Sequence, residues 1–299
     1  MISICIPIYN FKVRDLVHEL SIQSRNLIEA SEIILIDDGS SAAFKEANES
    51  ICATHKYIKL EKNIGRAAIR NQFLQYAQFN YLLFLDCDSQ IISPDFLSNY
   101  LSQVKDVKKH IVCGGRVQQR NRPSRDYLLR WKYGNAKESK TAQQRAKNPN
   151  QSFMTNNFLI NRELLKEVLF DERLIGYGHE DTFFGFELKK KNIPIYHIHN
   201  PVLNGDLEQN KKFLFQSEKA VSNLVYLLKI TNYDNELIQE VALLRMYYRL
   251  FKLRWLNKNL FILLSPLIKY FLVKGFISIL LFDYYKLGLL TLHLEKSKD

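Results

Sequence analysis

The chain has 299 residues and a mass of 35.2 kDa, a length that suits one large domain or one domain with an extension. It is 46% hydrophobic and 24% charged, which excludes a disordered or fibrous protein. The formal net charge of +11 favours an anionic partner, such as nucleic acid, acidic lipid or a phosphorylated small molecule, without choosing among them.

The first two hundred residues alternate between short apolar runs and segments with helical periodicity. This alternation predicts βαβ units, an α/β fold and a mainly parallel sheet, in which ligands bind at the carboxyl ends of the strands. The expected strands are 2–8, 32–37, 57–60 and 81–86, and the expected helices are 14–28, 42–53 and 66–79.

Residues 116–147 contain ten Lys or Arg residues and only two acids, and their hydrophobic periodicity fades. We expect a mobile basic segment that flanks one side of a ligand site or is simply a solvated loop. Order is expected again from residue 154, followed by a helix at 181–191 and a strand at 193–198.

Beyond residue 206 the pattern predicts helices at 207–228 and 235–255 and no strand. The expected domains are therefore 1–205 and a helical extension, 206–299. The stretches 259–268 and 275–282 have no charged residue, but Lys269, Lys274 and Asp283 bound them and leave each too short to span a membrane. A helical region on an anionic membrane surface and helices packed on the first domain both remain open.

The cysteines are too few and too far apart for a disulfide framework, and none has the spacing of a metal site. The first ten residues also lack the features of a signal peptide. We therefore expect a cytoplasmic protein, peripheral on the inner face of the membrane if its C-terminal helices bind lipid. The expected free, buried thiols are Cys5, Cys52, Cys87 and Cys113.

Asp86 and Asp88 follow the fourth expected strand, with Cys87 between them. Two carboxylates at the end of a buried strand can hold a hard divalent cation that also binds substrate phosphates. A solvated turn at the strand end is the alternative interpretation.

The second and third expected strands are also followed by polar motifs. Asp37 and Asp38 precede a glycine and can accept hydrogen bonds from a base or ribose, or cap the next helix. Arg66 and Arg70 lie one helical turn apart and can meet a diphosphate, or form ion pairs with Glu61 or Asp86.

Glu180 and Asp181 follow a glycine-rich turn and open a helix. The helix dipole stabilises a carboxylate at this position, which suits a general base, although simple N-capping explains the pair as well.

The order and spacing of these motifs resemble the family 2 glycosyltransferases, inverting enzymes of the GT-A fold. Segment 176–181 is also similar to the G-W-G-x-E-D motif of galactosyltransferase-type C-terminal segments. The resemblance covers about residues 1–205. The matching residues are Pro7, Ile8, Tyr9 and Asn10; Asp37, Asp38, Gly39 and Ser40; Asn63, Ile64, Gly65, Arg70 and Asn71; Asp86, Cys87 and Asp88; and Glu180 and Asp181.

The resemblance implies a nucleotide-sugar donor, a UDP-sugar first, and a glycan or lipid-linked acceptor, with no nucleic acid as partner. It implies Mn²⁺ or Mg²⁺ at Asp88 and Asp86, Asp181 as the catalytic base and Glu180 binding sugar hydroxyls. Tyr9 and Asp38 would hold the nucleobase. The residues implied around the nucleotide are Pro7, Tyr9, Asp37, Asp38, Asn63, Gly65, Arg66, Arg70 and Asp86.

One departure from the family concerns the metal. Similar enzymes often supply a metal-binding histidine near the position that Asn204 occupies here. His197 and His199 lie a few residues earlier, and a strand period of two would place both on one face. Either histidine is a candidate replacement ligand, and a core or surface role is the alternative for each.

Two other classes of protein compete with this interpretation. A phosphatase that uses a D-x-D strand end would explain Asp86 and Asp88, but such enzymes place the motif after the first strand. A non-enzymatic basic protein that binds nucleic acid or membrane would explain the charge, but it has no need of carboxylates at strand ends.

Overall fold

The computed structural model describes residues 1–52, 54–104 and 110–296, apart from the side chain of residue 52. The chain forms two compact units. The first contains Met1–Val117, Ser139–Ile175 and Glu180–Asp206, and the second contains Gln118–Glu138, Gly176–His179 and Leu207–Asp299. Two internal segments therefore group with the C-terminal helices, in addition to the residues that follow Asp206.

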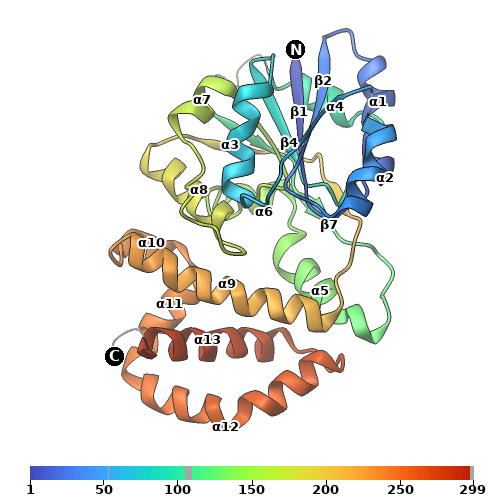
Figure 1. Cartoon of the computed structure of the whole chain (residues 1–299). Coiled ribbons are helices and arrows are strands. Elements are labelled where there is room, and N and C mark those ends of the chain that lie inside the picture. Colours follow the sequence, from blue (N-terminus) through green and yellow to red (C-terminus); the bar gives the residue numbers. More distant parts are fainter. Residues whose placement is uncertain (53, 105–109, 297–299) are drawn as a thin grey trace. The chain divides into compact units, whose positions relative to one another are not determined.

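The first unit is built on a seven-stranded sheet with the strand order β3-β2-β1-β4-β8-β6-β9 (Figure 1). The first four strands along the chain are parallel to one another, and β6 is parallel to β9. Only β8 runs antiparallel to its neighbours, β4 and β6. The strands are β1 (Ile2–Ile8), β2 (Ser31–Asp37), β3 (Lys56–Lys59), β4 (Tyr81–Leu85), β6 (Ile111–Cys113), β8 (Asn157–Asn161) and β9 (Ile195–His197).

A second sheet of three short strands has the order β5-β10-β7. It consists of β5 (Ser89–Ile91), β10 (Val202–Asn204) and β7 (Arg116–Val117). β5 begins directly after Asp88, and its Ser89 pairs with Asn204 of β10. This small sheet therefore fixes the chain that leaves the D-x-D motif.

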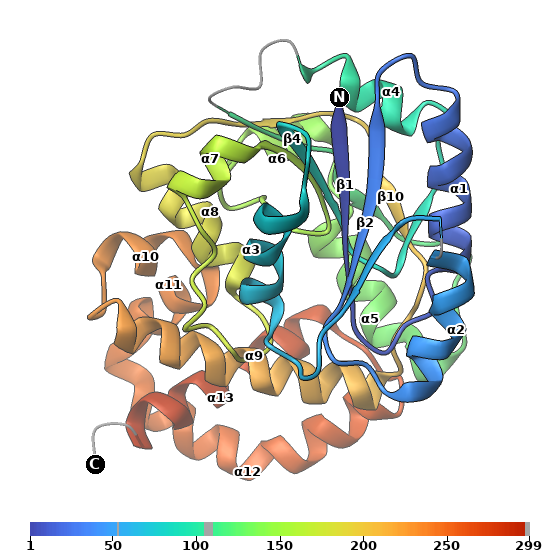
Figure 2. The same cartoon turned by 45° about the horizontal axis from the view of Figure 1, so that its top comes forward.

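Helices cover both faces of the large sheet, as Figures 1 and 2 show. Because strand side chains alternate, the even-numbered isoleucines of β1 face one hydrophobic cluster and Cys5 faces the other. The first cluster is covered by α1 (Arg14–Arg25), α2 (Ala42–Cys52) and α4 (Phe96–Leu101), and the second by α3 (Arg66–Tyr76), α7 (Arg162–Glu167) and α8 (Glu180–Lys190).

The four strands and three helices expected in residues 1–86 are all present, and the predicted α/β class with a mainly parallel sheet is confirmed. Cys5 and Cys113 are buried free thiols, and Cys87 is a half-buried one. The side chain of Cys52 lies outside the described residues. Burial raises the pKa of the Cys87 thiol to about 12, aided by the neighbouring Asp88 and Asp86, so this thiol stays protonated at neutral pH.

The prediction of a mobile segment at 116–147 is wrong, because short helices and buried arginines order it. Arg145 is buried, and its guanidinium donates to the carbonyls of Lys140, Gly114 and Ile198. Arg130 is also buried and pairs with Glu138 at 2.8 Å. The segment contains α5 (Leu128–Tyr133), a π-helical turn (Gly134–Glu138) and α6 (Ala142–Ala146).

The second unit is helical, as expected, and α13 packs against both α9 and α12 (Figure 1). The helix expected at 235–255 is interrupted at Val241, whose backbone is extended, and the Arg245 side chain donates to the carbonyls of Gln239 and Glu240 there. The helices are α9 (Asn210–Ile230), α10 (Asn235–Glu240), α11 (Ala242–Arg249), α12 (Arg254–Val273) and α13 (Ile279–Lys296). By length and composition, the segment Phe251–Val273 is apolar enough to cross a membrane.

Candidate active site

The ends of β1 and β2 are tied together by two reciprocal hydrogen bonds. The Asn10 amide donates to the Ser40 hydroxyl at 2.8 Å, and the Ser41 amide donates to the Asn10 side-chain oxygen at 3.0 Å. The Asp38 amide also donates to the Ile8 carbonyl at 2.7 Å. Tyr9, which is 52% exposed, therefore lies at a strand end adjacent to that of Asp38.

Asp37 and Asp38 are both buried, and each holds a loop in place. Asp37 accepts from the Ser40 amide at 2.7 Å and from the Tyr57 hydroxyl at 3.2 Å. Asp38 accepts from the amides of Ile64 and Gly65 at 2.7 and 3.2 Å, so it joins the end of β2 to the start of α3. Burial raises the pKa of Asp38, although these two amide bonds oppose the shift.

The Asp38 bonds bring the loop of the third expected motif beside the second. Asn63 is exposed within this loop, and Gly65 is buried with φ +91° immediately before α3. Pro7, near the end of β1, is half-buried. The residues expected around a nucleotide are thus gathered at the carboxyl ends of β1, β2 and β3.

Arg70 joins the D-x-D motif to the E-D motif. Its buried guanidinium donates to Asp86 Oδ1 at 2.9 Å, and its Nη1 lies 3.8 Å from Glu180 Oε1. Arg66, half-exposed, reaches the same Glu180 oxygen at 3.5 Å. The sequence left two interpretations for these arginines, contact with a diphosphate or ion pairs with Glu61 or Asp86. The ion pair between Arg70 and Asp86 is present in the structure. These contacts join three motifs that are distant in the sequence, since Arg66 and Glu180 are 114 residues apart.

The donor set of Asp86 and Asp88 fits a divalent cation. Asp86 and Asp88 both follow β4, and burial together with the charge of Asp86 raises the pKa of Asp88. Hard cations take oxygen ligands, and Mg²⁺ commonly uses one or two protein carboxylates and completes its shell with water and phosphate. Within residues 1–52, 54–104 and 110–296, no group of three or more His, Cys, Asp or Glu side chains is arranged for a metal.

His197 does not offer a lone pair to a metal. Its Nδ1 accepts from Arg145 Nε at 3.0 Å, so its Nε2 must carry the proton that it shares with the Pro149 carbonyl at 3.0 Å. Burial, with Arg145 adding to it, lowers the pKa of His197 to about 4 and keeps the ring neutral. His197 also lies on β9, three strands from β4.

The expectation that both histidines share a strand face is corrected as well. β9 ends at His197, so the exposed His199 follows the strand rather than belonging to it. The position next to the D-x-D motif belongs to Asn204, which is buried and whose successor Gly205 donates to the Asp88 carbonyl at 2.9 Å.

Asp181 lies in the first turn of α8, beside Glu180. One of its oxygens accepts from the Thr182 amide at 2.7 Å. Burial and the charge of Glu180 raise the pKa of Asp181 to about 6, while Arg70 and Arg66 oppose the shift. A carboxyl group with a pKa near 6 is mainly ionised at pH 7 and is a stronger base than an ordinary aspartate.

Asn156 lies next to the site but was not among the residues expected there from the sequence. Its carbonyl accepts from the Asp86 amide at 3.1 Å, and its buried side-chain oxygen has no hydrogen-bond partner among the residues that the structure describes. The same is true of Glu180 Oε2. The available signal was a polar pair at the start of an apolar strand, with Asn156 just before β8 and Asn157 as its first residue. Its proximity to Asp86 depends on antiparallel pairing of β8 with β4, which no short-range pattern indicates.

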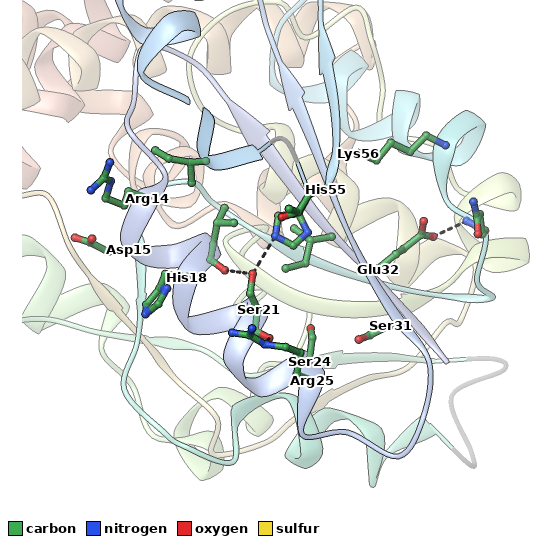
Figure 3. Close-up of a pocket in the computed structure, with 15 residues that line it drawn as sticks. Arg14, Asp15, His18, Ser21, Ser24, Arg25, Ser31, Glu32, His55 and Lys56 are labelled. Atoms are coloured by element: carbon green, nitrogen blue, oxygen red, sulfur yellow. Dashed lines mark hydrogen bonds between the residues drawn. The ribbon is translucent and has the colours of Figure 1, made fainter. Parts of the chain in front are cut away.

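A cavity of about 960 Å³ lies at the opposite edge of the sheet, near the amino ends of β2 and β3 (Figure 3). Ser21 contacts His55 there at 2.9 Å, and Glu32 is held by Ser3 and the Gln78 amide. The paired carboxylates described above do not line it, so the cavity and the candidate site are separate features.

The strand-end site and the doubly covered sheet define an α/β protein whose polar residues gather at the carboxyl ends of its parallel strands. Residues 3–169, more than half of the chain, match the family described as Glycosyl transferase family 2. The chain belongs to this family. The phosphatase and binding-protein alternatives are not favoured.

Curated relatives match over shorter segments. An uncharacterized glycosyltransferase of Bacillus subtilis (strain 168) is 31% identical over 114 residues, which are 38% of this chain and 29% of that protein. Cholesterol galactosyltransferase of Borreliella burgdorferi is 34% identical over 88 residues, 29% of this chain and 24% of that protein. The chain thus spans well under two thirds of the length of these relatives.

Solved structures extend the similarity to nearly the whole chain. A mannosyltransferase from Pyrobaculum calidifontis, in complex with GDP-Man and Mn²⁺, has a TM-score of 0.60 at 13% identity and covers 99% of this chain and 85% of its own. Glucosyl-3-phosphoglycerate synthase from Mycobacterium tuberculosis, in complex with Mg²⁺ and UDP, has a TM-score of 0.50 at 13% identity, covering 76% and 78%. The shared fold is GT-A, as predicted.

Proposed function

We propose that this enzyme transfers a sugar from a nucleotide-sugar donor to a hydroxyl group of a glycan or lipid-linked acceptor, with inversion at the anomeric carbon. The observation that carries the proposal is the contact of Arg70 with both Asp86 and Glu180. Through it, the candidate metal ligands, the nucleotide loop and the candidate base border one site at the carboxyl ends of the strands.

The donor nucleotide would lie along the ends of β1, β2 and β3. Tyr9 offers an exposed ring for stacking on a base, and Asp38, next to Asp37, retains lone pairs for its edge. A UDP-sugar is our first choice, and GDP is the competitor because the Pyrobaculum calidifontis enzyme was solved with GDP-Man. The residues proposed around the nucleotide are Pro7, Tyr9, Asp37, Asp38, Asn63, Gly65, Arg66, Arg70 and Asp86.

The metal ligands that we propose are Asp88 and Asp86, for Mn²⁺ or Mg²⁺. A bound cation would offset the charge that grows on the leaving diphosphate. Arg70 fixes the Asp86 carboxylate through its hydrogen bond, and Arg66, which is half-exposed, adds a positive charge near the same place. His197 is omitted because both of its ring nitrogens are occupied, and His199 because it is exposed after β9.

Asp181 is our candidate for the general base. Since one of its oxygens accepts from the Thr182 amide, the other oxygen would take the proton of the acceptor hydroxyl. The hydroxyl oxygen bonds to the anomeric carbon as the bond to the nucleoside diphosphate breaks on the opposite face. Glu180 Oε2 and the Asn156 side-chain oxygen, both buried without partners among the described residues, suit a hydroxyl-rich sugar.

The proposed location is the cytoplasm, peripheral on the inner face of the membrane, in a pathway that builds a polysaccharide or glycolipid. The net charge of +11 supports an anionic surface as a partner.

The Asp181→Asn variant tests the base. We expect nucleotide release from a panel of UDP-sugars and GDP-mannose, with mixed sugar acceptors, to fall by about 10²–10⁴-fold while donor binding is unchanged. Glu187→Gln, the same chemical change on the same helix, is the matched control and keeps full activity. Undiminished transfer by Asp181→Asn would exclude Asp181 from the base role.

A further inference from the structure

The helix α12 has an apolar face that the protein does not cover. Leu256, Leu263, Leu267 and Tyr270 recur at intervals of seven, four and three residues, so they share one side of the helix. All four are exposed, Leu263 to 75%. Helices on the surface of a soluble domain normally carry polar residues on this side, and a large exposed apolar stripe marks an interaction surface. We call these four residues the outward face of α12.

The opposite side of α12 is committed to packing within the second unit. Phe261 is buried and so close to Gly288 of α13 that a methyl group added there would lie 2.1 Å from its ring. Asn257 donates to the Thr291 hydroxyl at 2.9 Å, and Lys258 pairs with Glu295 at 3.2 Å. The helix therefore cannot rotate to bury its outward face without breaking these contacts.

Further exposed apolar side chains surround the outward face in sequence. Trp255 is 72% exposed at the start of α12, and Leu280 is 81% exposed at the start of α13. Phe276, between the two helices, is also exposed. Trp and Phe beside leucines are typical of helices that lie in the interface of a bilayer.

The positive charge of residues 241–282 favours an anionic partner. Residues 241–282 contain seven basic residues and no acid. Lys252 and Lys274 flank α12 in the chain, one before its start and one after its end, and both are exposed. Arg254 and Lys258 pair with Glu295, and Lys269 pairs with Glu218. The remaining positive charge would repel a second copy of this surface, whereas anionic lipid headgroups would attract it. The basic residues are Arg245, Arg249, Lys252, Arg254, Lys258, Lys269 and Lys274.

We propose that the outward face of α12 inserts into the surface of an anionic bilayer, with the helix axis parallel to the membrane plane. Although the segment Phe251–Val273 is long and apolar enough to span a bilayer, its inner side carries polar and charged groups bonded to α13. An interfacial helix satisfies both sides, because the apolar side enters the acyl region and the polar side stays on the protein. This inference does not depend on the proposed function.

The test is cosedimentation of the full chain with vesicles of phosphatidylcholine, with and without phosphatidylglycerol. We expect binding that is stronger with phosphatidylglycerol and that weakens with salt. The variant Leu256→Glu/Leu263→Glu/Leu267→Glu is expected to bind at least about tenfold more weakly, because it removes three apolar side chains from the inserted face and adds three negative charges. Ile28→Glu, at a fully exposed position of the first unit, is the matched control and binds like the wild type.

A fluorescence measurement covers the case in which the triple variant does not fold. The chain has two tryptophans, Trp131 and Trp255, so Trp131→Phe leaves Trp255 as the only reporter. Anionic vesicles should shift its emission to the blue and shield it from an aqueous quencher. An unshifted spectrum, vesicle binding unchanged by the leucine substitutions, or a dimer that Leu263→Glu dissociates while vesicles are not bound would each overturn the proposal.

Discussion

At the scale of single residues, the turn after β2 depends on one glycine. Gly39 has φ +71°, and a Cβ there would lie 2.5 Å from the Lys62 carbonyl carbon and 2.6 Å from the Asn63 amide nitrogen. Both neighbours are backbone atoms that cannot rotate away. Asp38 binds the same loop through Ile64 and Gly65, so the turn and the loop are held as one piece.

Replacing Gly39 by alanine should therefore destabilise the fold and disturb nucleotide binding together. We expect a loss of at least about 2 kcal/mol in the free energy of unfolding, from backbone strain and the clash combined. Urea denaturation measures it. Lys62→Ala is the control, because it trims an exposed side chain and leaves the backbone in place. Equal stability of Gly39→Ala and wild type would show that the loop moves freely.

The raised pKa of Asp181 makes a prediction about pH. Because the ionised form is the one that accepts a proton, kcat/KM should rise as pH increases through about 6 and then level off. The folded pKa also exceeds the unfolded value of about 3.9, so this group favours the folded state at low pH, and that contribution is lost as pH rises through about 6.

The Asp181→Asn variant separates these effects. It should lose the pH-dependent rise in activity, and its Tm at pH 7 should equal or exceed that of the wild type, since an unfavourable buried charge is removed. Differential scanning fluorimetry from pH 4 to pH 8 measures this, and a clearly lower Tm at pH 7 would indicate that the carboxylate stabilises the fold instead.

At the scale of elements, the site is assembled by α3 and α8, which cover the same face of the sheet. Arg70 on α3 and Glu180 on α8 are both nearly inaccessible, with side chains 3% and 4% exposed. Asn71, the next residue of α3, exchanges hydrogen bonds with the backbone of Phe170 and so fixes the chain that leads to the E-D motif.

Breaking this connection should cost stability as well as activity. Arg70→Ala removes a buried guanidinium from both Asp86 and Glu180 and leaves the buried Glu180 facing the half-exposed Arg66, and we expect a loss of about 3 kcal/mol in the free energy of unfolding. Arg66→Ala removes a half-exposed arginine and should cost less than about 1 kcal/mol. Chemical denaturation of the two variants in parallel tests the difference, and equal losses would contradict the central position of Arg70.

The elements themselves differ in how far the sequence predicts them. β1, β2 and β4 were predictable because each is a largely buried apolar run, and the short, partly exposed β3 was predictable because it lies between two helices of regular period. β5, β7 and β10 have two or three residues each, too short for any periodicity, and they are stabilised by pairing with one another. Segment 116–147 was predicted to be mobile from its charge, but the buried positions of Arg130 and Arg145 depend on partners that are distant in sequence, such as Ile198.

The candidate site shows the same division. The motifs with Asp38 and Asp86 were predictable because parallel strands bring their carboxyl ends to one edge. The motif with Asp181 was found from its place at the start of a helix and from the family resemblance. Asn156 was not, since antiparallel β8 delivers it from the opposite direction. The two histidines were misleading for a similar reason: pairing of β9 with β6 puts His197 far from β4, while β10 brings Asn204 beside the D-x-D motif.

At the scale of the whole molecule, the two units differ in what they bury and expose. The first places its carboxylates and arginines at one edge of a sheet whose faces are both covered. The second leaves the outward face of α12 uncovered and carries a basic stretch with no acid from residue 241 to 282. We therefore propose that donor chemistry belongs to the first unit and membrane contact to the second.

We propose above all that the strand-end site of this family 2 protein binds a nucleoside diphosphate together with a divalent cation. Calorimetric titration of UDP and GDP, each with and without Mn²⁺, into wild type and Asp88→Ala tests it most directly, with His199→Ala as the control. We predict UDP binding that requires Mn²⁺, is lost in Asp88→Ala and is unchanged in His199→Ala. Binding of neither nucleotide to the wild type, with or without metal, would contradict it.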